Sequence, residues 1–276
     1  MTAADRWRDQ LAAWAIPDEI VAAAPEPPWG YSTQLFRTRA EGAISAEPTP
    51  TTNRALEALP EGGAVLDVGV GGGATSLPLA THAGLIVGVD GQADMLEVFR
   101  AAAGSAGIRT QTVQGAWPDV SPEVDIVDVA VSGHVAYNVP ELGPFAQALG
   151  AHARRRVVLE LTERHPLAWM SDLWLHFHGL ARPDGPTVDD ARAVLFEIGI
   201  DARREDRIVN ALNEGGGGFV RRQDAIHLVR KRLCLDASHD DEIAARLGSD
   251  LRQVQGAWDV GPDERTIVTL WWDTAA

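Results

Sequence analysis

The sequence predicts an α/β fold built on a mostly parallel sheet with helices on both faces. Segments of strand and helix character alternate from about residue 50 to residue 200. The strand segments are nearly continuous apolar runs, as expected for strands buried on both faces. The first strand runs into a glycine-rich turn at 65–75, where free backbone N–H groups can face a small ligand.

The N-terminal part, 1–46, precedes this alternation. Trp7 and Trp14 recur with apolar neighbours at helical spacing and predict an amphipathic helix, and Pro17 can start a second one. A proline-rich break at 25–28 leads into aromatic residues. These aromatic residues either pack on the domain surface or close over a ligand, and they are Trp29, Tyr31 and Phe36.

The remaining elements follow in order. Strands are predicted at 64–69, 85–90, 108–113, 124–131, 156–161, 201–209 and 265–272. Helices are predicted at 51–59, from 76 to about 82, and at 93–103, 141–153, 188–198, 219–233 and 240–247. One long connection, 162–187, follows the fifth strand and is rich in aromatic residues. Its length and composition predict a lid over the carboxyl edge of the sheet.

The bulk composition limits the function classes. The chain has 276 residues, a net charge of −15 and one cysteine, Cys234. Such an acidic chain lacks the basic surface that nucleic-acid binding usually requires, and a lone cysteine excludes an intramolecular disulfide. No run approaches the roughly 20 apolar residues of a membrane span, and the N-terminus has no signal-peptide pattern. We therefore expect a cytoplasmic protein with neither a nucleic-acid nor a membrane partner.

The glycine-rich turn fits the dinucleotide pattern GxGxxG/A, with Asp90 about 20 residues beyond it. Asp67 separates the alternatives, because it lies two positions before the first glycine. A carboxylate there would repel the pyrophosphate of a dinucleotide but favours a ligand with an amino group or a sulfonium. S-adenosylmethionine has both, and its ribose diol suits Asp90. A nicotinamide-dependent oxidoreductase is therefore the less favoured alternative.

Three segments resemble motifs of the class I S-adenosylmethionine-dependent methyltransferases. They are 65–73, 87–90 with the following Met95, and 128–140, which resembles the bacterial type-11/12-like small-molecule members. The resemblance runs from about 50 to 200 and again over 265–272. It implies a Rossmann-like sheet of seven strands with the last one antiparallel, and S-adenosylmethionine as the cofactor.

The resemblance also implies which residues bind the cofactor. The first glycines would line the methionine end of the cofactor. The tip of the second strand would bind its ribose, and the end of the fourth strand would lie beside its sulfonium. The residues so assigned are Asp67, Gly69, Gly71, Gly73, Asp90, Gly91, Gln92, Met95, Gly115, Ala116, Trp117, Ser132 and Gly133. Family members often have Asp where Ala116 stands, so backbone groups would hold the adenine here. Trp117 would either stack on the adenine or pack in the core.

The catalytic candidates are two histidines near the carboxyl edge. A hydroxyl acceptor of high pKa needs a base, which histidine supplies near neutral pH. His134 follows the fourth strand and is the first candidate, His165 follows the fifth, and a packed structural histidine is the competing interpretation of each. Residues expected near a substrate are Trp29, Tyr31, Tyr137, Asn138, Trp174 and His178. The histidine spacing at 176 and 178 suits no single helical face, so no metal site is predicted.

These inferences define the predicted organisation. We expect an N-terminal helical cap over 1–48 and a methyltransferase domain over 49–276, with insertions at about 162–187 and 210–262. The predicted reaction is methyl transfer to an oxygen or nitrogen of a small molecule, the alternative being a non-catalytic sensor or partner-binding module. The basic segment 201–232 is interpreted as a solvated face paired with acidic residues. A site for an anionic substrate or a homodimer contact is its alternative.

Overall fold

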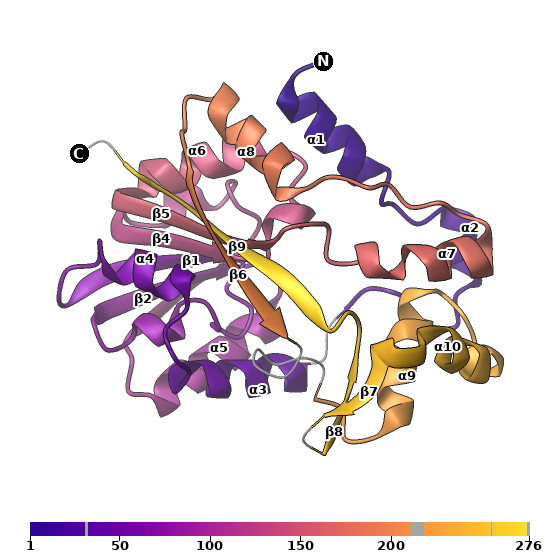
Figure 1. The fold of residues 1–276 in the computed structure, drawn as a ribbon. Coiled ribbons are helices and arrows are strands. Elements are labelled where there is room, and N and C mark those ends of the chain that lie inside the picture. Colours follow the sequence, from indigo (N-terminus) through magenta and orange to yellow (C-terminus); the bar gives the residue numbers. More distant parts are fainter. Residues whose placement is uncertain (31–32, 211–217, 255, 275–276) are drawn as a thin grey trace.

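A seven-stranded sheet forms the centre of the molecule (Figure 1). The computed structural model describes residues 1–30, 33–210, 218–254 and 256–274. The strands are β1 (Gly63–Val68), β2 (Ala83–Asp90), β3 (Thr110–Gln114), β4 (Val127–Gly133), β5 (Ala153–Thr162), β6 (Arg203–Asn210) and β9 (Glu264–Asp273). Their order is β3-β2-β1-β4-β5-β9-β6, and β9 runs antiparallel to both of its neighbours. The predicted sheet with an antiparallel last strand is confirmed.

Helices cover both faces of this sheet. One face carries α1 (Ala3–Ala12), α6 (Leu142–His152) and α8 (Val188–Glu197), and the other carries α3 (Thr33–Ile44), α4 (Pro50–Leu56) and α5 (Ala93–Ser105). Adjacent residues of a strand enter opposite cores, because side chains alternate along a strand. Leu66 of β1 belongs to the core under α6, whereas Val65 belongs to the core under α5.

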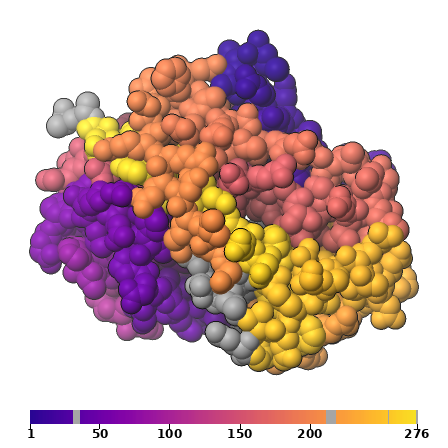
Figure 2. All heavy atoms as spheres, viewed as in Figure 1, coloured from indigo at the N-terminus to yellow at the C-terminus, as the bar shows by residue number. Residues whose placement is uncertain are grey.

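A third apolar core lies outside the sheet and defines what we call the second lobe. The lobe contains α7 (Ser171–His178), α9 (Arg222–Arg232), α10 (Asp240–Leu247) and the hairpin of β7 (Leu251–Val254) and β8 (Ala257–Val260). The N-terminal segment joins this core through Ile16 and through Ile20 of α2 (Asp18–Ala23). Figure 1 shows the lobe beyond the carboxyl end of β5, and in Figure 2 its yellow residues lie opposite the purple part of the sheet domain.

Two local predictions differ from the structure, and two elements were not predicted. The helix expected from 76 to about 82 is only the 3-10 turn Leu77–Leu79, because Pro78 cannot donate a hydrogen bond and β2 already begins at Ala83. The connection 162–187 contains α7, which the sequence analysis placed in a loop. The helix α3 and the hairpin β7–β8 were not predicted.

Candidate active site

The glycine-rich turn forms a tight cradle at the carboxyl end of β1. Gly69 and Gly71 have φ angles of 72° and 50°, which favour glycine over residues with a side chain. A Cβ atom at Gly69 would lie 2.3 Å from a methyl group of Val135, and one at Gly71 would lie 2.7 Å from the ring of Phe36. The turn therefore requires glycine both for its backbone conformation and for the close approach of its neighbours.

Asp67 lies beneath this turn as a buried carboxylate. Asp67 is only 1% exposed, and neither of its carboxylate oxygens has a hydrogen-bond partner among the described residues. Burial raises the pKa of Asp67 to about 7, and the charge of Asp90 adds to the shift. An unpaired carboxylate in such surroundings is costly, and a nearby cation would relieve that cost.

Asp90 connects the end of β2 to the same turn. One carboxylate oxygen accepts from the Gly71 backbone N–H at 2.9 Å, and the other accepts from the Gln92 N–H at 2.9 Å. Gly91 and Gln92 are exposed at the start of α5, whereas Met95 is buried in that helix. In this structure Asp90 thus fixes the turn and the helix start.

These groups fit S-adenosylmethionine better than a dinucleotide. The orphaned carboxylate of Asp67 favours a cationic ligand and disfavours a pyrophosphate at the turn. The glycine cradle allows a ligand to approach the backbone closely. When bound, this cofactor supplies a methyl group on a cationic sulfur.

The segment after β3 contains the residues expected near adenine. The Gly115 N–H donates to the Asp90 carbonyl at 3.0 Å, and Ala116 is exposed. Trp117 packs against the core under α6, and its indole N–H donates to the Phe145 carbonyl at 3.3 Å. These contacts favour the core interpretation of Trp117 over stacking on adenine.

The carboxyl end of β4 lies directly against the glycine turn. The Ser132 hydroxyl donates to the Val68 carbonyl at 2.7 Å and ties β4 to β1. Gly133 is crowded by Thr75, since a Cβ atom there would lie 2.1 Å from the Thr75 hydroxyl oxygen. Val135 also contacts Gly69. His134 lies between Gly133 and Val135 in the sequence, so it belongs to the rim of the cradle.

His134 is paired with a carboxylate from the neighbouring strand. Its Nε2 atom lies 3.2 Å from Oε1 of Glu160, and its backbone N–H donates to the Glu160 carbonyl at 2.7 Å. The His134 side chain is 49% exposed, so its ring is accessible to a ligand. Its φ angle of 59° is uncommon for a residue other than glycine.

His165 lies in an aromatic stack instead. Its ring stacks on Trp14 with centroids 3.9 Å apart and meets the edge of Tyr137 at 5.5 Å. Its Nδ1 atom accepts from the Leu167 N–H at 3.3 Å. Burial, together with the charge of Arg182, lowers the pKa of His165 to about 4. These contacts favour the structural interpretation of His165, and none of them involves His134.

The residues expected near a substrate are dispersed. Tyr137 is 5% exposed and donates from its hydroxyl to the Thr162 carbonyl at 2.8 Å, and Asn138 is exposed beside it. Trp174 is 2% exposed inside the second lobe, where His178 donates to the Leu233 carbonyl at 2.6 Å. Trp29 is 49% exposed on the N-terminal segment. Tyr31 lies outside the described residues.

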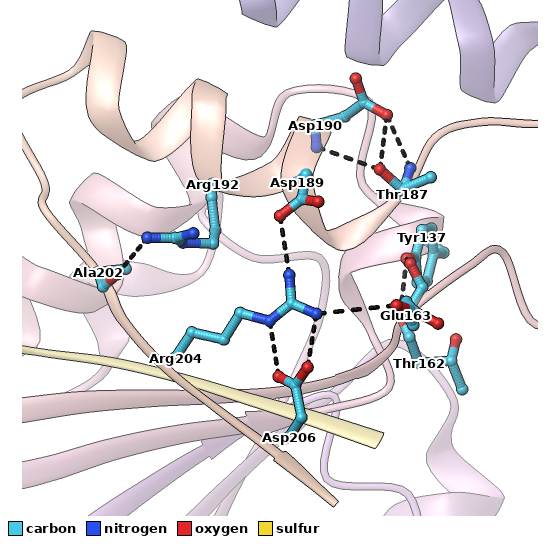
Figure 3. Close-up of polar contacts among 10 residues, drawn as sticks. All are labelled: Tyr137, Thr162, Glu163, Thr187, Asp189, Asp190, Arg192, Ala202, Arg204 and Asp206. Carbon is cyan, nitrogen blue, oxygen red and sulfur yellow. Dashed lines mark hydrogen bonds and ion pairs between the residues drawn. The ribbon is translucent and has the colours of Figure 1, made fainter. Parts of the chain in front are cut away.

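Most basic residues of 201–232 are held by acidic partners or carbonyl groups. Figure 3 shows Arg204 of β6, which donates to both carboxylate oxygens of Asp206 and to Asp189 at 2.8 Å. In the second lobe Arg230 pairs with Asp240 at 2.8 Å. This pairing favours a solvated, internally compensated face over an anion-binding site.

Within the described ranges, no group of three or more His, Cys, Asp or Glu residues is arranged to hold a metal ion. The same part of the chain contains no helix of sufficient length and apolar character to cross a bilayer.

Two contributors to the site, both threonines, were not identified as such in the sequence. The hydroxyl of Thr51 donates to Glu160 Oε2 at 2.5 Å and lies 2.8 Å from the hydroxyl of Thr269. Phe36, on α3, packs against Gly71; the sequence had left open whether it packs on the domain surface or closes over a ligand. The two threonines give no local signal, since only the fold brings α4, β5 and β9 together.

Comparisons with known proteins address the family and the fold. Residues 65–155 match the family model described as a methyltransferase domain. No curated protein is detectably similar in sequence.

Solved structures share the fold at low sequence identity. A candidate methyltransferase from Bacillus halodurans has a TM-score of 0.53 and 14% identity, with 82% of this chain and 99% of that chain covered. The YcgJ protein from Bacillus subtilis has a TM-score of 0.52 and 15% identity, with 82% and 98% covered. Residues 65–155 are therefore similar to a methyltransferase domain, and the chain shares its fold with these solved structures.

Proposed function

We propose that this protein methylates a hydroxyl or amino group of a small organic molecule. The supporting observation is the pairing of His134 with Glu160 beside the glycine cradle. An accessible imidazole on the rim of a methyl-donor site suits an acceptor that must lose a proton. Amine and hydroxyl acceptors both meet this condition.

The second lobe supports a small acceptor. It is built from two insertions, which leave the sheet after β5 and after β6, and both of these strands end at the edge that also holds the glycine turn (Figure 1). A lobe in this position can exclude water from the reacting groups and select an acceptor by shape. We therefore assign substrate selection to the second lobe and to the N-terminal segment packed on it.

Cofactor binding is tested by calorimetry with S-adenosylmethionine and S-adenosylhomocysteine. The variant Asp90→Ala removes the carboxylate that we expect to bind the ribose of the cofactor. In the structure this carboxylate accepts from the backbone N–H groups of Gly71 and Gln92. Losing a charged hydrogen-bonding group of this kind costs about 1.5–3 kcal/mol, so we expect binding to weaken by roughly 10- to 150-fold. Asp94→Ala is the matched control, because Asp94 is an exposed carboxylate that accepts from the backbone N–H of Met95 in the next position.

The acceptor class is tested by a panel of small alcohols, phenols and amines, with formation of S-adenosylhomocysteine as the readout. Turnover with any member supports the proposal. Tight cofactor binding without turnover across the panel contradicts it and revives the sensor alternative. Unchanged cofactor affinity in Asp90→Ala contradicts the assigned cofactor site.

A further inference from the structure

We propose that Glu160 is the positioning residue for His134 and that the pair accepts the proton of a hydroxyl acceptor. This inference rests on the proposed function and narrows its acceptor to an oxygen nucleophile. The pair is formed by the ends of the adjacent parallel strands β4 and β5, where Gly133 lies opposite Glu160. The two residues are joined twice, through the backbone and through their side chains.

The geometry assigns different roles to the two ring nitrogens of His134. Nε2 is the atom that faces the Glu160 carboxylate, at 3.2 Å. A carboxylate only accepts hydrogen bonds, so this nitrogen carries the proton and Nδ1 keeps its lone pair. Nδ1 is therefore the atom that receives a proton from the acceptor.

Glu160 is itself fixed from other elements. Its side chain is 15% exposed, Thr51 of α4 donates to Oε2 at 2.5 Å, and Thr269 of β9 lies opposite it in the sheet and contacts Thr51. Burial by itself raises the pKa of Glu160, but hydrogen bonds from His134 and Thr51 and the charge of Arg207 lower it overall. The carboxylate is thus held ionised in one orientation, as an orienting group for a base requires.

The location suits a base for the transfer. His134 lies between Gly133, which contacts Thr75, and Val135, which contacts Gly69. Its left-handed backbone is a strained conformation for a residue with a side chain, and the hydrogen bond to the Glu160 carbonyl helps to hold it. Strain of this kind is common where a side chain must be aimed at a ligand.

The proton and electron balance is simple. The acceptor oxygen bonds to the methyl carbon, the carbon–sulfur bond breaks, and its electron pair stays on sulfur as a neutral thioether. The hydroxyl proton passes to Nδ1 of His134 and is later released to water. Glu160 takes no proton and stabilises the imidazolium formed in this step.

The pairing is tested without substrate by NMR of protein labelled with ¹⁵N-histidine. The wild type should show a His134 Nε2–H that exchanges slowly with water, and Glu160→Gln should lose this protection. Glu163→Gln is the matched control, because its carboxylate is 51% exposed and lies 3.9 Å from Arg204, outside the pair. Equal protection in Glu160→Gln and the wild type would overturn the pairing.

The catalytic consequence is tested with S-adenosylmethionine and phenols of graded acidity. Glu160→Gln should lower kcat at least about tenfold for weakly acidic phenols, with little change in KM, because base catalysis contributes about 10²–10⁴-fold. The loss should shrink for phenols already ionised at the assay pH, since these need no base. A merely structural role would reduce all rates alike, and that result would overturn the inference.

Two further outcomes separate this inference from the proposed function. Calorimetry with S-adenosylhomocysteine on Glu160→Gln must show wild-type affinity, which establishes that the variant is folded. Wild-type turnover of amines alone contradicts the hydroxyl acceptor while leaving methyl transfer intact. Absence of any turnover contradicts the proposed function, and the NMR result then decides the pairing separately.

Discussion

Asp67 shows how one residue relates binding to stability. Its carboxylate is buried and unpaired, so the folded protein without ligand tolerates an unfavourable charge under the glycine turn. The cation of a bound cofactor would offset this cost, and the interaction would be strong because the surroundings are poorly solvated. A residue that weakens the fold can in this way strengthen ligand binding.

The pH dependence of stability should reveal this cost. The pKa of Asp67 is raised from 3.8 to about 7, so the folded state holds a proton that the unfolded state releases. The Asp67 contribution to the free energy of unfolding should therefore fall as pH rises from about 4 to about 7, by up to about 4 kcal/mol. Asp67→Asn lacks this dependence and should gain stability relative to the wild type across that range in urea unfolding. A stability difference independent of pH would contradict the prediction.

At the level of elements, one aromatic stack joins segments far apart in sequence. Trp14 follows α1, stacks on His165 after β5, and donates from its indole N–H to the Gly185 carbonyl at 2.7 Å. The Arg182 guanidinium lies over the rings of Trp14 and Trp174, at 5.0 and 4.9 Å from their centroids. This stack fastens the N-terminal segment and the second lobe to the end of β5.

Acid should weaken this stack. The pKa of His165 is lowered from 6.5 to about 4, so the folded state disfavours a proton that the unfolded state binds. Its contribution is fully present above about pH 6.5 and is lost as pH falls to about 4, by up to about 3 kcal/mol. His165→Phe keeps the aromatic packing and should be less sensitive to acid than the wild type in urea unfolding between pH 4 and 7. Equal acid sensitivity of the two proteins would argue against a buried neutral His165.

At the scale of the whole molecule, three apolar cores divide the chain. Two cores lie on opposite faces of the sheet, and the third holds the second lobe together. Residues before α3 contribute to a sheet core and to the core of the second lobe. Trp7 belongs to the first and Ile16 to the second. The lobe thus has the packing of a separate cooperative unit joined to the sheet at its carboxyl edge.

Trp174→Ala should loosen the lobe without unfolding the sheet. Trp174 is 2% exposed, and deleting a buried tryptophan side chain costs about 3–5 kcal/mol. Hydrogen exchange measured by mass spectrometry should rise in α7, α9 and α10 while β1 and β4 stay protected. The control is Leu175→Ala on the same helix, where the side chain is 54% exposed and little change is expected. A uniform rise over all strands would show instead that lobe and sheet unfold together.

The central sheet and the glycine turn follow from local features of the amino-acid sequence. Continuous apolar strands and glycines at 69, 71 and 73 are local signals, because each residue's own burial or backbone angle imposes its identity. Asp67 likewise indicated a cationic ligand through its position before the turn. These features need no information about distant parts of the chain.

Contacts between residues far apart in the sequence depend on the tertiary fold. His134 and Glu160 pair because β4 and β5 are neighbours in the sheet, and Thr51 reaches them because α4 packs beside β5. Two insertions separated by α8 and β6 share one core in the second lobe, and Trp117 turns to α6 rather than to the cofactor site. Hydrophobic periodicity indicates that a residue is buried, but it does not identify the residues that pack against it. Those partners depend on the order of the strands and on where the helices pack.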